Sequence, residues 1–215
     1  QALANVSQLI AFAPLSGLDV LELAALCPTD SYVALREAGG DTLLVTATGI
    51  VLRQKPIHTT HRFGAARSEC SEILQTPLGR IGLVAGDDSI FPETCRLLAI
   101  AGAEIVIAPV TPLEQWELAT GLIERAAENR LNILAPASGP HMGFAASLQT
   151  DFTVMTKWQS RCFDGLLTQP IVTRASSPLT FVTLHPAAAD NKLVSHNTDL
   201  VAGRPWALAG AIVDY

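Results

Sequence analysis

The 215-residue sequence has no apolar run of the roughly 18 residues that a membrane-spanning helix needs. It also has no cluster of lysine and arginine, and its formal net charge is -6, which argues against nucleic acid or an anionic membrane surface as a partner. The first residues carry no basic segment ahead of an apolar one, so they do not resemble a signal peptide. These absences predict a cytoplasmic protein with neither a nucleic-acid nor a membrane partner.

Cysteine is scarce as well. Four cysteines are present, at positions 27, 70, 95 and 162, and no two of them have CxxC spacing. That usage is typical of a reducing compartment. His58 and His61 lie three residues apart, but no third ligand is recognisable, so we expect no metal and no cofactor.

Charged residues make up only 16% of the chain, whereas apolar residues make up 49% and the mean hydropathy is +0.32. This balance predicts strands that are covered on both faces. A chain of this length favours one buried core over two, so we expect residues 1–215 to form a single domain. The apolar composition also predicts a homodimer, since a single chain would leave part of its hydrophobic surface uncovered.

Periodicity and turn residues predict a mixed sheet with helices packed on one face. Residues 92–102 are expected to form a helix, because Pro92 suits a first turn and Gly102 suits a helix end. Apolar residues that lie mostly on one face predict a second helix within 113–130. Strands are expected at 42–47, 50–55, 71–76, 80–85, 104–109 and 132–137, and later at 163–170, 170–175 and 179–184.

Residues 79–93, GRIGLVAGDDSIFPE, predict a strand that runs through a tight turn into a helix. In a hydrolase of this shape the turn presents the nucleophile, but here it holds Gly86, which has no side chain. We call residues 86–88 the elbow. The sequence therefore combines the local scaffold of a nucleophile site with no nucleophile in it.

Residues 74–138 resemble the carbon–nitrogen hydrolase, or nitrilase, superfamily. The run TPLGRIGLVAGDDSIFPETCRLLAIAGAEIVIAP is similar to that family's strand–elbow–helix–strand segment. ERAAENRLNILAPAS is similar to its Ala-x-Glu-Asn stretch, and RQKPIH is similar to the Lys-Pro-Thr-His run that carries its catalytic lysine. The resemblance implies a four-layer αββα sandwich with mixed sheets and a shortened N-terminal part, assembled as a dimer.

The same resemblance implies a catalytic site. Members of the family hydrolyse or transfer non-peptide carbon–nitrogen groups with a Cys nucleophile, a Lys that stabilises the oxyanion and a Glu that transfers protons. Lys55 matches the lysine, and Gly86 falls at the nucleophile position. The backbone N–H of Asp87 matches the second oxyanion donor.

Three further positions are implied to bind substrate, namely Asp88, Glu93 and Asn129. The family's glutamates, in contrast, have no counterpart. The general base falls on Pro14, and a second glutamate that often follows the lysine falls near Thr60. A hydrolase of this type would therefore lack its proton-transferring group as well as its nucleophile.

These losses predict a domain without hydrolytic activity that serves as a small-molecule-binding, regulatory or dimerisation domain. Removing a covalent nucleophile alone typically costs on the order of 10⁴–10⁶ in kcat. The alternative is an active amidohydrolase or nitrilase with a displaced nucleophile or a missing segment. Asp87, Asp88 or Cys70 would then attack, although a carboxylate here more often caps the following helix and complements its dipole. Cys95 is expected to be a buried apolar residue, and Lys55 either faces the site or is an ordinary solvated lysine.

Overall fold

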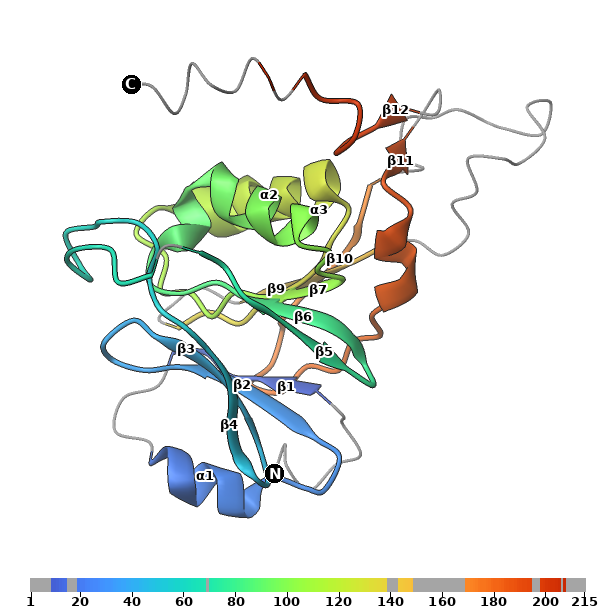
Figure 1. Ribbon diagram of the computed structural model, residues 1–215. Coiled ribbons are helices and arrows are strands. Elements are labelled where there is room, and N and C mark those ends of the chain that lie inside the picture. Colours follow the sequence, from blue (N-terminus) through green and yellow to red (C-terminus); the bar gives the residue numbers. More distant parts are fainter. Residues whose placement is uncertain are drawn as a thin grey trace.

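The computed structural model describes residues 9–14, 19–68, 70–138, 143–148, 169–194, 198–205 and 207. Two β-sheets lie face to face, and helices cover the outer face of each sheet (Figure 1). The layers follow the order helix, sheet, sheet, helix, which confirms the four-layer sandwich expected from the sequence. No helix within the described residues is long and apolar enough to cross a membrane.

The first sheet contains four strands in the order β1-β2-β3-β4. These strands are β1 (Leu9–Ala11), β2 (Tyr32–Arg36), β3 (Thr42–Thr46) and β4 (Gly49–Gln54). Strand β1 runs parallel to β2 and is joined to it through helix α1 (Val20–Leu26), whereas β2, β3 and β4 are antiparallel. The β3–β4 hairpin confirms the predicted turn, in which Gly49 has a φ of +113°.

The second sheet contains six strands in the order β10-β9-β8-β7-β6-β5. These strands are β5 (Ile73–Thr76), β6 (Gly79–Leu83), β7 (Ile105–Ile107), β8 (Asn132–Ala135), β9 (Phe144–Ser147) and β10 (Ile171–Arg174). Strands β6, β7 and β8 are parallel, because helices α2 (Pro92–Ile100) and α3 (Leu122–Asn129) cross over between them. The carboxyl ends of these three strands therefore meet at one edge of the sheet, where the elbow follows β6.

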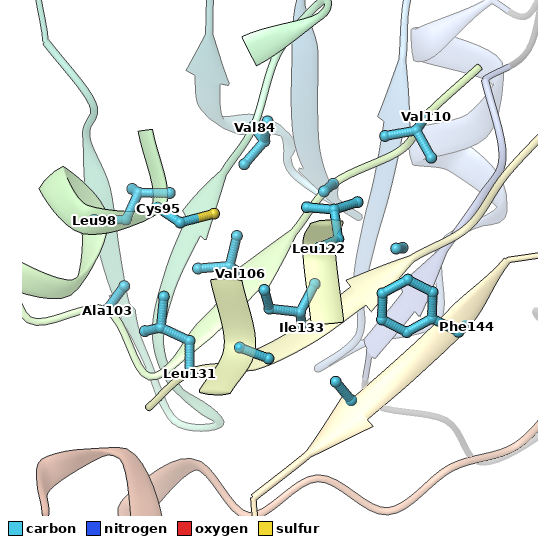
Figure 2. Packing of buried hydrophobic residues seen from close by; sticks show 14 of the residues in the cluster. Val84, Cys95, Leu98, Ala103, Val106, Val110, Leu122, Leu131, Ile133 and Phe144 are labelled. Atoms are coloured by element: carbon cyan, nitrogen blue, oxygen red, sulfur yellow. The ribbon is translucent and has the colours of Figure 1, made fainter. Parts of the chain in front are cut away.

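Helices α2 and α3 pack on the outer face of the second sheet. Figure 2 shows Cys95 of α2 and Leu122 of α3 gathered with Val106 of β7 and Ile133 of β8. Each of these four residues is at most 1% exposed. Burial raises the pKa of the Cys95 thiol to about 12, so Cys95 is the packing residue that the sequence predicted.

Apolar side chains also fill the space between the two sheets. The first sheet contributes Ala34, Leu44 and Leu52, and the second contributes Ile81, Leu83, Ile105 and Ile107. The parallel strands of the second sheet are thus covered on both faces, by helices on one side and by the first sheet on the other. This arrangement accounts for the apolar composition of those strands.

The helix predicted within 113–130 is confirmed, since the chain is helical from residue 115 to residue 129, but part of it is π-helical. Residues Glu117–Gly121 form a π-helical turn, which continues directly into α3 at Leu122–Asn129. The buried carboxylate of Glu117 accepts hydrogen bonds from the N–H groups of Leu113 (2.7 Å) and Glu114 (2.8 Å). These bonds hold the preceding residues in a turn rather than in a helix.

The strand predicted at 179–184 is wrong, because the described structure pairs no strand there. Leu184 packs against the cluster between the sheets, whereas Phe181 is 61% exposed. Alternation of apolar residues shows that a segment could be extended, but a strand also needs a partner that is distant in sequence. The strand predicted at 170–175 is confirmed as β10, and residues 163–168 lie outside the described residues.

Lys192 ties the C-terminal part of the chain to α3. Its Nζ donates hydrogen bonds to the main-chain oxygens of Asn129 (3.0 Å) and Arg130 (2.9 Å), at the C-terminal end of that helix. A cation at this end offsets the partial negative charge of the last carbonyl groups. Burial first, and then the charge of Arg130, lower the pKa of Lys192 to about 8, whereas Asp190 opposes the shift.

We expect the free energy of unfolding to rise between about pH 8 and pH 10.5 because of the deprotonation of Lys192. The folded pKa lies below the unfolded one, so in this window the unfolded chain binds more protons and stability rises with pH. Urea unfolding at several pH values measures the slope, which should shrink in Lys192→Met. Lys55→Met removes an exposed lysine and is the matched control. Equal slopes in wild type and Lys192→Met would contradict the expectation.

Candidate functional site

The elbow begins at Gly86, whose backbone is left-handed, with a φ of +53°. Its N–H donates a hydrogen bond to Gly40 O (2.8 Å), and its carbonyl oxygen accepts one from Arg36 Nη1 (2.9 Å). A Cβ at this position would lie 3.0 Å from Pro56 Cγ and 3.1 Å from Phe63 Cδ2. Glycine therefore suits this place both because of its conformation and because neighbouring side chains fill the space beside it.

The ring of Phe63 lies between two glycines. It contacts the place beside Gly86 where a Cβ would stand, and a Cβ on Gly40 would approach Phe63 Cδ1 to 2.6 Å. Two guanidinium groups flank the ring, since Cζ of Arg36 and Cζ of Arg62 each lie 5.3 Å from its centroid. These distances are within the range of cation–π attraction.

Phe63 belongs to a connection between β4 and β5 that we call the 55–68 loop, drawn in teal at the left of Figure 1. The carboxylate of Asp88, which is 1% exposed, holds this loop against the elbow. It accepts hydrogen bonds from the N–H groups of Ile57 (2.9 Å) and His58 (3.0 Å), and it contacts His58 Nδ1 at 3.0 Å. The His58 ring also stacks on Phe91, with the two ring centroids 3.9 Å apart.

Two arginines of the 55–68 loop form ion pairs with carboxylates of the main body. Arg62 pairs with the buried carboxylate of Asp87, and Arg67 pairs with Asp41. The loop is thus joined to both the elbow and the turn after β2. Burial raises the pKa of the Asp88 carboxyl, and the hydrogen bonds that it accepts oppose the shift.

The predicted capping role of Asp87 and Asp88 is wrong. Neither side chain makes a capping hydrogen bond at the short 3₁₀ helix Asp88–Ile90 or at α2. Each carboxylate instead binds the 55–68 loop, whose residues lie 25 to 31 positions earlier in the sequence. The elbow carboxylates therefore hold tertiary structure together.

Arg36 is a site residue that the sequence reasoning missed. It lies at the end of β2 and is only 4% exposed, and its Nη2 donates to Thr111 Oγ1 (2.8 Å). Thr111 in turn is hydrogen-bonded to Ser138 (2.7 Å), so the loops after β7 and β8 contribute hydroxyl groups next to the elbow. Burial and the charge of Arg62 lower the pKa of Arg36 to about 10, whereas Asp87 opposes the shift. A charged residue that ends the apolar run YVALR is the signal in the sequence that would have pointed to Arg36.

The other predicted site residues differ in burial and in their place in the fold. Lys55 is exposed, and it is the ring of the next residue, Pro56, that contacts the Gly86 position. Glu93 is exposed in the first turn of α2. Asn129 is fully buried at the end of α3, before β8 begins, and so lies at the opposite end of the parallel strands from Gly86.

The glutamate positions were expected at Pro14 and Thr60. Pro14 follows β1, whose carboxyl end lies beside that of β2, so this position is at the same edge of the first sheet as Arg36. Thr60 lies in the 55–68 loop, where its Oγ1 accepts a hydrogen bond from the Phe63 N–H (3.2 Å). Neither position supplies a carboxylate to the elbow.

No family model and no curated protein matches the sequence. Solved structures of amidases from Nesterenkonia do match it. A mutant of the Nesterenkonia AN1 amidase from the nitrilase superfamily has a TM-score of 0.55 and 15% identity over 66% of this chain and 70% of that chain. A crystal structure of an amidase from Nesterenkonia sp. has a TM-score of 0.55 and 16% identity over the same shares of both chains.

A third structure extends the match over nearly the whole chain. It is a glutamine-for-glutamate mutant of the Nesterenkonia amidase that carries the acetamide moiety of fluoroacetamide on its active-site cysteine. Its TM-score is 0.62 at 15% identity, and the match covers 95% of this chain and 83% of that chain. The chain therefore has the two-sheet fold of nitrilase-superfamily amidases.

Proposed function

We propose that this chain is a carbon–nitrogen hydrolase-type domain that does not hydrolyse and instead binds a small molecule through the region around its elbow. One observation carries the proposal. Gly86 follows β6 at the position that resembles the family's nucleophile position, and Phe63 and Pro56 fill the space beside it that a side chain would need. A covalent intermediate has no atom to form on at this position.

The remaining groups at the elbow support the same conclusion. Asp87 and Asp88 are both buried and bonded to the 55–68 loop, so neither carboxylate is free to attack a carbonyl carbon or to transfer a proton. Cys95 is buried with a raised pKa, and Cys70 lies at the end of the loop that leads into β5. Neither of these two cysteines belongs to the elbow, residues 86–88.

Hydrolysis requires a group beside the elbow that can take up a proton, and the positively charged group beside the elbow cannot do so. A proton-transferring carboxylate is expected near Pro14, but β2 ends at this edge in the buried Arg36 guanidinium, and the buried carboxylate of Asp41 is paired with Arg53 and Arg67. A guanidinium stays protonated at neutral pH and cannot act as a general base. Arg36 therefore supports ligand binding rather than proton transfer.

The homodimer expected from the apolar composition stays a prediction.

The direct test is to incubate the purified protein with simple amides, nitriles and carbamoyl amino acids, and separately with fluoroacetamide. We expect no product above the uncatalysed rate. We also expect no covalent mass increase at the elbow, because residues 86–88 contain no cysteine. Turnover by the wild type that falls in Lys55→Met would overturn the proposal, because it would show that the family's catalytic lysine still works.

A further inference from the structure

The Arg36 guanidinium carries more positive charge than its contacts neutralise. Its described hydrogen bonds go to two uncharged acceptors, Gly86 O at 2.9 Å and Thr111 Oγ1 at 2.8 Å. They use two of the five N–H groups of the side chain. Burying a guanidinium without a directly bonded anion is costly, so such a place favours the arrival of one.

The charges around Arg36 do not supply that anion from within the described chain. The negative charge of Asp87 raises the pKa of Arg36, but the Asp87 carboxylate accepts its hydrogen bonds from Arg62. Arg62 adds a second positive charge, which repels Arg36. Asp88, the other elbow carboxylate, is committed to the amides of the 55–68 loop. Two guanidinium groups, those of Arg36 and Arg62, therefore share the charge of one carboxylate, that of Asp87.

The Phe63 ring lies next to this guanidinium, with Arg36 Cζ 5.3 Å from the ring centroid. It lies against Gly40 and Gly86, which have no side chains, and the Pro56 ring borders the same space. The residues on either side of it, Arg62 and Gly64, are exposed. Gly64 is joined to Thr60 by two main-chain hydrogen bonds, from the Gly64 N–H to Thr60 O (2.8 Å) and from the Thr60 N–H to Gly64 O (2.9 Å), so a ligand that takes the place of the ring must displace it against these contacts.

We propose that Arg36 is the anchor of a binding site for a small carboxylate with a planar apolar group, which Phe63 occupies in the absence of the ligand. The planar group would take the place of the Phe63 ring between Gly40 and Gly86. The carboxylate would form the bidentate pair with Arg36 that guanidinium and carboxylate groups favour. The proposal rests on the proposed function, because a hydrolase would need the same space for its nucleophile.

The ligand and Phe63 compete for one place, and this competition makes the proposal testable. Benzoate is a suitable probe because it joins a phenyl ring to a carboxylate, and benzamide is its uncharged counterpart. Phe63→Ala removes the competing ring, so benzoate should stabilise this variant against heat at about tenfold lower concentration than it stabilises the wild type. Benzamide should bind Phe63→Ala about tenfold more weakly than benzoate, because it cannot form the charged pair.

Arginine variants identify the anchor. In the Phe63→Ala background, Arg36→Gln should abolish the preference for benzoate over benzamide. Arg67→Gln removes an arginine of the same loop that binds Gly39 O and Asp41, so it is the matched control and should keep the preference. If Arg36→Gln fails to fold, the comparison of benzoate with benzamide on Phe63→Ala still tests the role of charge.

Three outcomes would overturn the proposal: equal binding of benzoate and benzamide to Phe63→Ala, no binding of benzoate to that variant, or no stabilisation of the wild type up to the solubility of benzoate. The proposed function is tested separately by the absence of hydrolysis in the wild type. Hydrolysis together with benzoate binding would remove the proposed function and leave the carboxylate site. Absence of both would do the reverse.

Discussion

Gly86→Cys is expected to yield no amidase activity and a protein less stable than the wild type. A side chain at a φ of +53° costs about 1–2 kcal/mol for a residue other than glycine. The new Cβ would also lie 3.0 Å from Pro56 Cγ and 3.1 Å from Phe63 Cδ2, so these rings must move before a thiol fits. The thiol would thus be introduced into a space that is already filled, and simple amides should not reach it.

A double variant separates crowding from chemistry. Gly86→Cys with Phe63→Ala frees the space beside the thiol, so its sulfur should now displace fluoride from fluoroacetamide, with the thiol proton passing to solvent, and the acetamide group left on the sulfur should raise the mass of the protein. Turnover of amides should still be absent, because the general acid–base step, worth about 10²–10⁴-fold, has no carboxylate. Gly64→Cys is the matched control: it has a φ of +75° and open space around it, so it measures the backbone cost without the crowding.

Robust amide turnover by the single variant Gly86→Cys would contradict this account. It would mean that the rings of Phe63 and Pro56 move aside readily and that a proton-transferring group exists at the elbow. Turnover by the double variant alone would have a narrower meaning. It would show that a base is present and that Phe63 is what blocks the substrate.

The elements that the sequence predicted correctly are those determined by neighbouring residues. The hairpin at Gly49 needs a positive φ at one position, and glycine supplies it. Helix α2 starts at Pro92 and ends just before Gly102, in agreement with the usual places of these residues. The strand at 179–184 failed for the converse reason, because pairing depends on a partner elsewhere in the chain.

The same distinction explains how much of the site could be predicted. The position of Gly86 after a buried strand follows from the local pattern, and the structure places it there. The contact of Arg36 with Gly86 joins residues 50 positions apart, and no local pattern reports such a contact. Phe63 lies in a connection without regular structure, so its place between Gly40 and Gly86 depends on how the whole loop folds back.

Asp88→Ala is expected to lower the free energy of unfolding by about 3 kcal/mol and to free the 55–68 loop. The lost carboxylate is 1% exposed and accepts two main-chain N–H groups, from Ile57 and His58. Each buried N–H left without an acceptor costs about 1–3 kcal/mol. Urea unfolding measures the loss, and limited proteolysis detects release of the loop by cleavage within residues 55–68.

Glu93→Ala is the matched control, because it removes an exposed carboxylate five positions later, in the first turn of α2. Surface changes of this kind stay within about 0.5 kcal/mol, so the difference between the two variants isolates the contribution of the buried contacts. If Asp88→Ala costs no more than Glu93→Ala, Asp88 does not hold the loop.

If Asp88→Ala releases the loop as expected, Phe63 leaves the elbow with it. Benzoate should then bind Asp88→Ala more tightly than the wild type, because the ring no longer competes for the space beside Arg36.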